Sequence, residues 1–149
     1  MLDLKELERI CADFRKAIEE VKNKKGFFSN NPCKDRMSGF PENCCDDTSD
    51  LLGYYLLHDS GMSLVTRQLR YKLDSFSFHS VLQTDEGIIL DLTGDQFEFE
   101  ERPAVYVGEE DEWFESMQTK EIINNYDFIS DNNQRLTKDY NAILDKLPK

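Results

Sequence analysis

The sequence predicts an α+β fold, with helices first, an antiparallel sheet in the middle and helices last. Apolar residues recur at helical spacing near both ends of the chain, whereas apolar and polar residues alternate as in strands beyond Gly61. No internal repeat, low-complexity segment or linker divides the 149 residues. Since 39% of them are hydrophobic, the chain can bury one core, and we expect residues 1–149 to form a single domain.

Two helices are expected in the first part of the chain. The first covers residues 3–24, where apolar side chains recur every three or four positions, and a cationic segment with Gly26 ends it. Residues 27–43 are rich in Asn, Ser, Gly and Pro, which predicts a long loop. A second amphipathic helix is expected over residues 46–60 and ends at Gly61.

Four strands are expected in the middle of the chain, because the hydrophobic period changes to two. The second and third are separated by an Asp-Glu-Gly segment at residues 85–87, a tight reversal that predicts an antiparallel hairpin. The expected strands cover residues 65–73, 76–83, 87–93 and 104–107.

Two further helices are expected at residues 111–127 and 132–147, where apolar side chains again recur at helical spacing. Trp113 follows the acidic segment 108–112 and has two interpretations. It is either an exposed aromatic side chain of a docking surface or a tryptophan packed into the core.

The charge balance excludes several classes of partner. The chain has 18 basic and 30 acidic residues, a formal net charge of −12, and no run rich in Lys or Arg, so we expect it not to bind nucleic acid. Its charged N-terminal segment has no hydrophobic signal core, and no run of about 18 apolar residues occurs. The expectation is a cytoplasmic protein that does not enter a membrane.

The four cysteines do not form the pattern of a disulfide framework. Cys11 lies on the apolar stripe of the first helix, as a buried thiol would. Cys33 lies in the polar loop, and a bridge between the neighbours Cys44 and Cys45 would be distorted. With two histidines in the chain and no paired-ligand spacing, we expect no metal and no cofactor.

Cys45, His79 and Asp91 are the candidate catalytic residues. Cys45 precedes a helix, whose N-terminal N–H groups favour a thiolate and can receive an oxyanion. His79 and Asp91 lie on successive strands, where hairpin pairing can bring a base and its orienting group together. Each also has a structural interpretation: a buried thiol, a core histidine bonded to a carbonyl, and a carboxylate that caps a strand end.

Three segments carry a resemblance to a known group of proteins. They are Phe-Pro-Glu-Asn-Cys-Cys at residues 40–45, His79, and Asp-Leu-Thr-Gly-Asp-Gln-Phe at residues 91–97. Together they resemble small bacterial proteins with a papain-like or transglutaminase-like core. The resemblance covers residues 40–108 and leaves residues 1–39 and 109–149 as helical extensions.

The resemblance implies a cysteine helix packed on an antiparallel sheet and an enzyme that transfers acyl groups. Cys45 would be the nucleophile, His79 the general base and acid, and Asp91 the group that orients the imidazole. The expected activity is that of a peptidase, amidase, deamidase or transglutaminase acting on a protein or peptide, and a basic substrate would suit the acidic surface. The alternative is an inactive protein of the same fold that serves as a binding or regulatory module.

Several neighbours could support the site. The helical periodicity does not decide whether Cys44 or Cys45 is the nucleophile. The resemblance implies that Cys45 is the nucleophile and that Cys44 is a packing residue. Asn43 could donate to an oxyanion or form an Asx turn. Gln96 could hold the Asp91 loop or lie on a turn.

Three aspartates crowd the cysteine pair, and nearby negative charge disfavours a thiolate. They are Asp46, Asp47 and Asp50. His58, near the end of its helix, is expected to be exposed.

Overall fold

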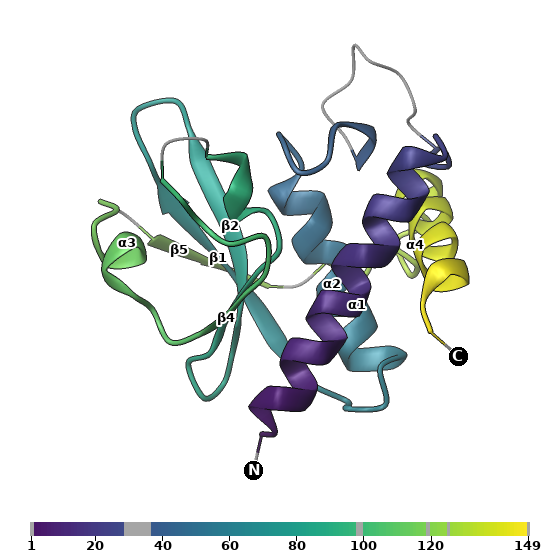
Figure 1. Cartoon of the computed structure of the whole chain (residues 1–149), viewed down its shortest axis with the longest axis horizontal. Coiled ribbons are helices and arrows are strands. Elements are labelled where there is room, and N and C mark those ends of the chain that lie inside the picture. The colour runs from purple at the N-terminus through teal and green to yellow at the C-terminus, as the bar shows by residue number, and fades with distance from the viewer. Residues whose placement is uncertain (1, 29–36, 98–99, 119, 125, 149) are drawn as a thin grey trace.

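The computed structural model describes residues 2–28, 37–97, 100–118, 120–124 and 126–148, and within them the chain is α+β, as predicted (Figure 1). Cys33 and the middle of the expected loop at residues 27–43 lie outside the described residues.

The helices expected at residues 3–24, 46–60 and 132–147 are confirmed. They are α1 (Leu4–Asn23), α2 (Cys45–His58) and α4 (Gln134–Lys146). A carboxylate caps the first of them, since Asp3 accepts a hydrogen bond from the Glu6 N–H at 3.2 Å, and Asn133 caps the last in the same way at Leu136. Two short 3₁₀ helices, η1 (Met37–Gly39) and η2 (Gly94–Gln96), flank the candidate site in sequence.

The sheet contains five antiparallel strands within the described residues, in the spatial order β4-β3-β2-β1-β5. Gly87 has a φ of 91° in the reversal between β2 and β3, so this hairpin is confirmed. The strands are β1 (Thr66–Lys72), β2 (Phe78–Thr84), β3 (Ile89–Asp91), β4 (Tyr106–Gly108) and β5 (Lys120–Ile123).

The helix expected at residues 111–127 is wrong. A single helical turn, α3 (Glu112–Glu115), is followed by β5, which pairs with β1 along the edge of the sheet. Ile122, counted as part of an apolar helical stripe, is 63% exposed on this strand. The open edge of β1 offers backbone hydrogen bonds that a helix would not satisfy, and residues 109–149 are therefore not a purely helical extension.

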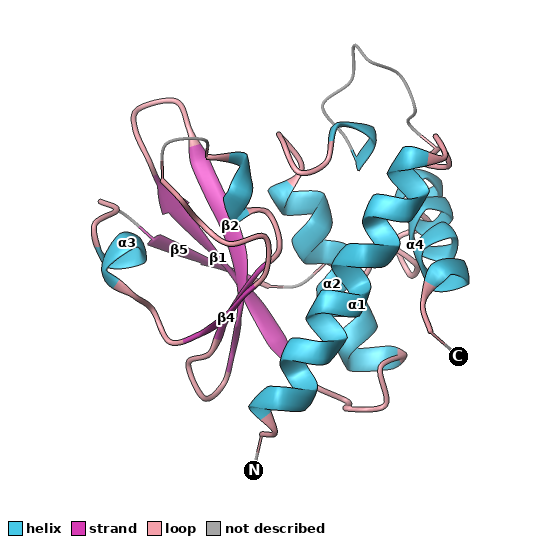
Figure 2. Ribbon diagram, in the orientation of Figure 1, coloured by secondary structure: helices cyan, strands magenta, loops and turns pink. Residues whose placement is uncertain are grey.

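Apolar side chains pack on both faces of the sheet. Neighbouring residues of β2 point to opposite faces: Leu82 joins the core formed by α1, α2 and α4, whereas Val81 packs with Tyr71 and Phe114. Figure 2 shows the three long helices together on one side of the sheet and α3 on the other. Since α1 and α4 share one core with α2, the two ends of the chain hold the cysteine helix in place.

The described part of the chain has no helix with both the length and the apolar character that crossing a bilayer requires.

Candidate functional site

The three described cysteines differ sharply in environment. Burial raises the pKa of the Cys11 and Cys44 thiols to about 12. Cys44 immediately precedes α2, and its sulfur accepts a hydrogen bond from the Thr48 hydroxyl at 3.7 Å. Cys45 is the first residue of α2 and is only half-buried. The geometry thus gives Cys44 a packing role and leaves Cys45 as the accessible thiol.

His79 and Asp91 form a buried hydrogen bond between adjacent strands. The His79 Nε2 and the Asp91 Oδ2 lie 2.8 Å apart, and the two side chains are 0% and 1% exposed. The other carboxylate oxygen of Asp91 accepts a hydrogen bond from the Thr93 N–H at 3.0 Å. Because a carboxylate only accepts, Nε2 carries the proton, and Asp91 fixes both the tautomer and the orientation of the ring.

The second ring nitrogen of His79 is left for the thiol. Nδ1 is buried and makes no hydrogen bond of standard geometry within the described residues, while the Cys45 side chain lies close enough to interact with the ring. Burial lowers the pKa of His79, but the charge and hydrogen bond of Asp91, with a smaller contribution from Cys45, outweigh burial and raise it to about 9. The structure thereby brings Cys45, His79 and Asp91 together.

Aromatic side chains surround the imidazole. The Phe97 ring lies 4.9 Å from the His79 ring and perpendicular to it, and the Trp113 ring lies at 5.7 Å. Trp113 also contacts Phe114 at 5.0 Å, so it is packed against the site rather than presented on a separate docking surface. The apolar surroundings limit access of water to the His79–Asp91 pair and strengthen its electrostatic interaction.

The aspartates near the thiol are offset by nearby groups. Arg70 on β1 pairs with Asp46 at 3.2 Å, and Arg135 on α4 pairs with Asp47 at 2.8 Å. Burial raises the pKa of Asp50 to about 7, so this carboxyl group is partly protonated at neutral pH. The negative charge expected to oppose a thiolate is therefore largely compensated.

Arg15 on α1 supports the site and was not singled out from the sequence. Its guanidinium donates two hydrogen bonds to the Asp95 carboxylate, at 2.7 and 2.8 Å, and others to the carbonyls of Leu92 and Ala104. It also lies over the Phe40 ring, 4.7 Å from the centroid. The signal for it in the sequence is an arginine at helical spacing from the apolar residues of the first helix.

The two other supporting candidates, Gln96 and Asn43, lie close to the site residues in sequence. Gln96 lies in η2, and within the described residues the Asp91 carboxylate is held by His79 and Thr93 instead. Asn43 is exposed and has a φ of 57°, which is turn geometry that asparagine tolerates.

His58 is exposed at the end of α2, as expected, and stacks on Tyr54. The described side chains include no group of three or more His, Cys, Asp or Glu residues that could hold a metal ion.

Comparison of the chain with protein-family models, curated proteins and solved structures finds no match among them. The function must therefore be inferred from the chemistry of the site itself.

Proposed function

We propose that the protein is a cysteine enzyme that transfers acyl groups, with Cys45 as nucleophile, His79 as general base and acid, and Asp91 as the orienting carboxylate. The observation that carries the proposal is the buried hydrogen bond between His79 and Asp91, which leaves the second imidazole nitrogen for a thiol at the first residue of a helix. A thiol, a base and an orienting group in this order are the components of nucleophilic catalysis.

The proposed reaction proceeds in two halves. His79 takes the proton of the Cys45 thiol, the sulfur forms a bond to an amide carbonyl carbon, and the carbonyl π electrons move to the oxygen. When the carbonyl re-forms, the carbon–nitrogen bond breaks and the imidazolium gives its proton to the leaving amine. Water or a second amine then loses a proton to His79 as it forms a bond to the thioester carbonyl carbon. The carbon–sulfur bond breaks when the carbonyl re-forms, the acyl group leaves with the water or amine, and the sulfur recovers the proton from His79.

Three features of the site favour these steps. The first turn of α2 presents backbone N–H groups near the sulfur, and the Cys44 side chain makes no capping hydrogen bond that would occupy them. The raised pKa of His79 favours an imidazolium beside a thiolate at neutral pH. The ion pairs of Asp46 and Asp47 remove most of the local negative charge.

The arrangement also supports a papain-like or transglutaminase-like core, in which a cysteine helix packs against a sheet that carries the histidine. The substrate in this proposal is a protein or peptide, and the net charge of −12 favours a basic one. A reactive free thiol is best maintained in the reducing cytoplasm, which we propose as the location.

Alkylation by iodoacetamide tests the nucleophile. Mass spectrometry of each cysteine across pH should show selective labelling of Cys45 below about pH 8.5, the ordinary pKa of a free thiol. His79→Ala should abolish the preference, whereas His58→Ala, which changes the exposed histidine at the far end of α2, should preserve it.

Acyl transfer itself can be tested with p-nitrophenyl acetate. The enzyme should give a burst of p-nitrophenol and an acetyl group on Cys45, and Cys45→Ala should give neither. Slow, uniform alkylation of the cysteines without a burst would overturn the proposal and favour a binding module of the same fold.

A further inference from the structure

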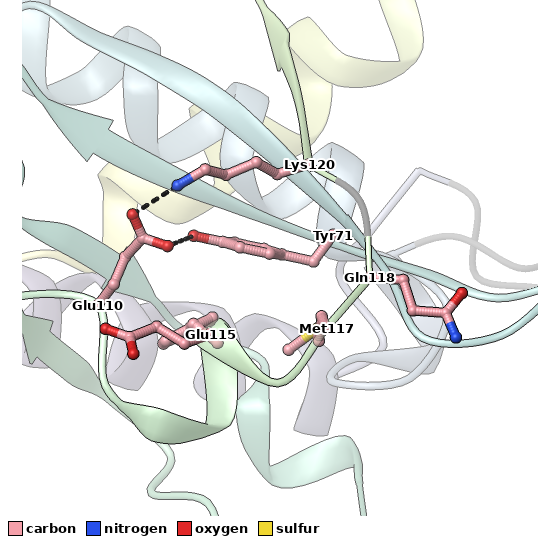
Figure 3. Close-up of a pocket in the computed structure, with 7 residues that line it drawn as sticks. Tyr71, Glu110, Glu115, Met117, Gln118 and Lys120 are labelled. Carbon is pink, nitrogen blue, oxygen red and sulfur yellow. Dashed lines mark hydrogen bonds and ion pairs between the residues drawn. The ribbon is translucent and has the colours of Figure 1, made fainter.

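A pocket opens on the face of the sheet that carries α3 (Figure 3). Its cavity volume is about 280 Å³. Tyr71 and Phe114, both almost fully buried, and Met117 give it apolar walls, while Glu110, Glu115 and Lys120 supply its charged groups. A pocket with apolar walls and a few charged groups is typical of a site that binds an elongated side chain with a polar end.

The charged groups of the pocket are not equivalent. Glu110 accepts hydrogen bonds from the Tyr71 hydroxyl at 2.8 Å and from the Lys120 ammonium at 2.7 Å, as Figure 3 shows. Glu115 is exposed and forms no ion pair within the described residues. Because Glu110 and Lys120 neutralise each other, the pocket retains the single negative charge of Glu115.

The pocket lies next to the candidate site. Tyr71 on β1 is directly opposite His79 on β2, and the Trp113 ring bridges His79 and the pocket residue Phe114. In the strand order β3-β2-β1, Asp91 lies on one side of His79 and Tyr71 on the other. Residues directly paired in an antiparallel sheet share a face, so the Tyr71 wall of the pocket lies on the same face as the His79 ring with which Cys45 interacts.

We propose that this pocket binds the lysine or arginine side chain of a peptide substrate close to the carbonyl that Cys45 attacks. The inference rests on the acyl-transfer function proposed above. The methylene groups of the side chain would pack against Tyr71, Phe114 and Met117, and its cationic end would meet the Glu115 carboxylate. The net charge of −12 also favours the approach of such a substrate.

Three peptidyl chloromethyl ketones test the pocket. They carry lysine, norleucine or glutamate at the residue next to the ketone, and the thiolate displaces chloride to form a stable thioether. Norleucine keeps the apolar chain of lysine without its charge, so it separates packing from electrostatics. We expect Cys45 to react fastest with the lysine reagent and slowest with the glutamate reagent, with a lysine-to-norleucine ratio of roughly fivefold for an exposed ion pair.

Variants of α3 assign the preference to the pocket. Glu115→Gln should bring the lysine-to-norleucine ratio close to one, and Glu115→Lys should make the glutamate reagent the faster of the charged pair. Glu112→Gln removes an exposed glutamate of the same short helix that does not line the pocket, and should leave the ratio unchanged.

The outcomes separate the pocket from the chemistry. The pocket proposal is overturned if Cys45 reacts equally with all three reagents, or if Glu115→Lys leaves the lysine preference intact. The proposed nucleophile stands in either case, provided that labelling of Cys45 is selective and depends on His79. If no reagent labels Cys45 in preference to the other cysteines, and His79→Ala changes nothing, the proposed function fails as well.

Discussion

His79 shows how a buried ionisable residue can be held ready for proton transfer. Its ring is fully buried, which by itself disfavours the imidazolium, yet the adjacent Asp91 carboxylate raises its pKa to about 9. One nitrogen is occupied by the carboxylate and the other is left for the thiol. The protonation state of a single side chain thus links the buried carboxylate to a half-buried sulfur.

Asp91→Asn should therefore slow the chemistry of Cys45. Without the carboxylate, burial dominates and the pKa of His79 falls from about 9 to its ordinary value of 6.5 or below, which lowers its imidazolium population at pH 7.5 about tenfold. We expect iodoacetamide labelling of Cys45 at pH 7.5 to slow by at least about tenfold, and NMR titration of His79 to show the lower pKa. Asp85→Asn, in the exposed β2–β3 turn, is the control; equal rates in both variants would contradict the role of Asp91.

Gly94→Ala should disturb the same carboxylate by steric contact. A Cβ at this position would lie 3.0 Å from the Asp91 Oδ2 and 3.2 Å from the Arg102 Cβ. We expect a loss of about 1–3 kcal/mol in the free energy of unfolding, measured with urea, together with slower labelling of Cys45. Gly39→Ala meets no atom within 4 Å and should change neither quantity.

The residues of the site differ in how far the sequence predicts them. Cys45, His79 and Asp91 are chemically distinctive, and their order together with the strand pattern places them near one another. Arg15 and Trp113 act through tertiary contacts with segments about 80 and 34 residues away in sequence, so no local pattern connects them with His79 or Asp95. Long-range partners of this kind become visible only in the folded chain.

At the scale of elements, α1 is fixed to the segment that follows β3. Arg15 joins the helix to Asp95 and to the carbonyls of Leu92 and Ala104, and thereby holds the chain on either side of η2. Since Leu92 is the neighbour of Asp91, α1 supports the strand end that carries the carboxylate of the candidate site.

Arg15→Met should destabilise the protein by about 2–4 kcal/mol, because it leaves the partly buried Asp95 carboxylate and two carbonyls without their donor. Urea denaturation measures the loss. Arg9→Gln, on the exposed face of the same helix, removes only solvent-exposed ion pairs. It should leave the urea concentration at the midpoint of unfolding almost unchanged. Similar midpoints for the two variants would show that Arg15 does not hold the segment.

The start of α2 depends on cations from other elements. Arg70→Gln should leave the charge of Asp46 uncompensated beside the thiol and so disfavour the thiolate. We expect labelling of Cys45 at neutral pH to slow by roughly two- to fivefold at low salt, with a smaller difference at high salt. A rate that is the same in the variant and the wild type at low salt would argue against this compensation.

The helix expected at residues 111–127 shows where prediction from local sequence patterns fails. Residues 111–127 contain Trp113, Met117, Ile122 and Tyr126 at spacings close to a helical repeat, yet the chain forms one turn of helix and then β5. The open edge of β1 decides the outcome, because pairing with it satisfies backbone groups over Lys120–Ile123. The competing partner, β1, is 49 to 55 residues away in sequence and is absent from any local window.

At the scale of the whole molecule, hydrophobic periodicity is sufficient to predict the α+β class, the three long helices and the β2–β3 hairpin. It does not predict the strand order, because the order depends on which edges remain available once the hairpins have formed. The position of the site follows from that order, since β3 and β1 flank the strand that carries His79.

The pH dependence of stability reflects groups that lie in different parts of the fold. Burial raises the pKa of Asp50 to about 7 and that of Asp139 to about 6, and the pKa of His79 is about 9. Each group binds its proton more tightly in the folded chain than in the unfolded chain, so the free energy of unfolding should fall as the pH rises. The fall should occur between about pH 4 and pH 7 for the two aspartates and between about pH 6.5 and pH 9 for His79.

Thermal unfolding followed by circular dichroism should accordingly give a lower midpoint at pH 9 than at pH 5.5. Asp50→Asn should flatten the slope between pH 5 and pH 7, because the amide has no proton to lose in that range. Acidic groups with lowered pKa values, such as Asp74 and Asp127, titrate below this range and do not change the sign. A midpoint that rises from pH 5.5 to pH 9 would contradict the prediction.

The ion pair between Arg135 and Asp47 can form only after α4 has been synthesised. Translation delivers the sulfur, the imidazole and the carboxyl group well before it delivers α4. On the proposed function, a nascent chain that ends ahead of α4 therefore lacks the cation that compensates Asp47, and its thiol should be less reactive than that of the folded protein.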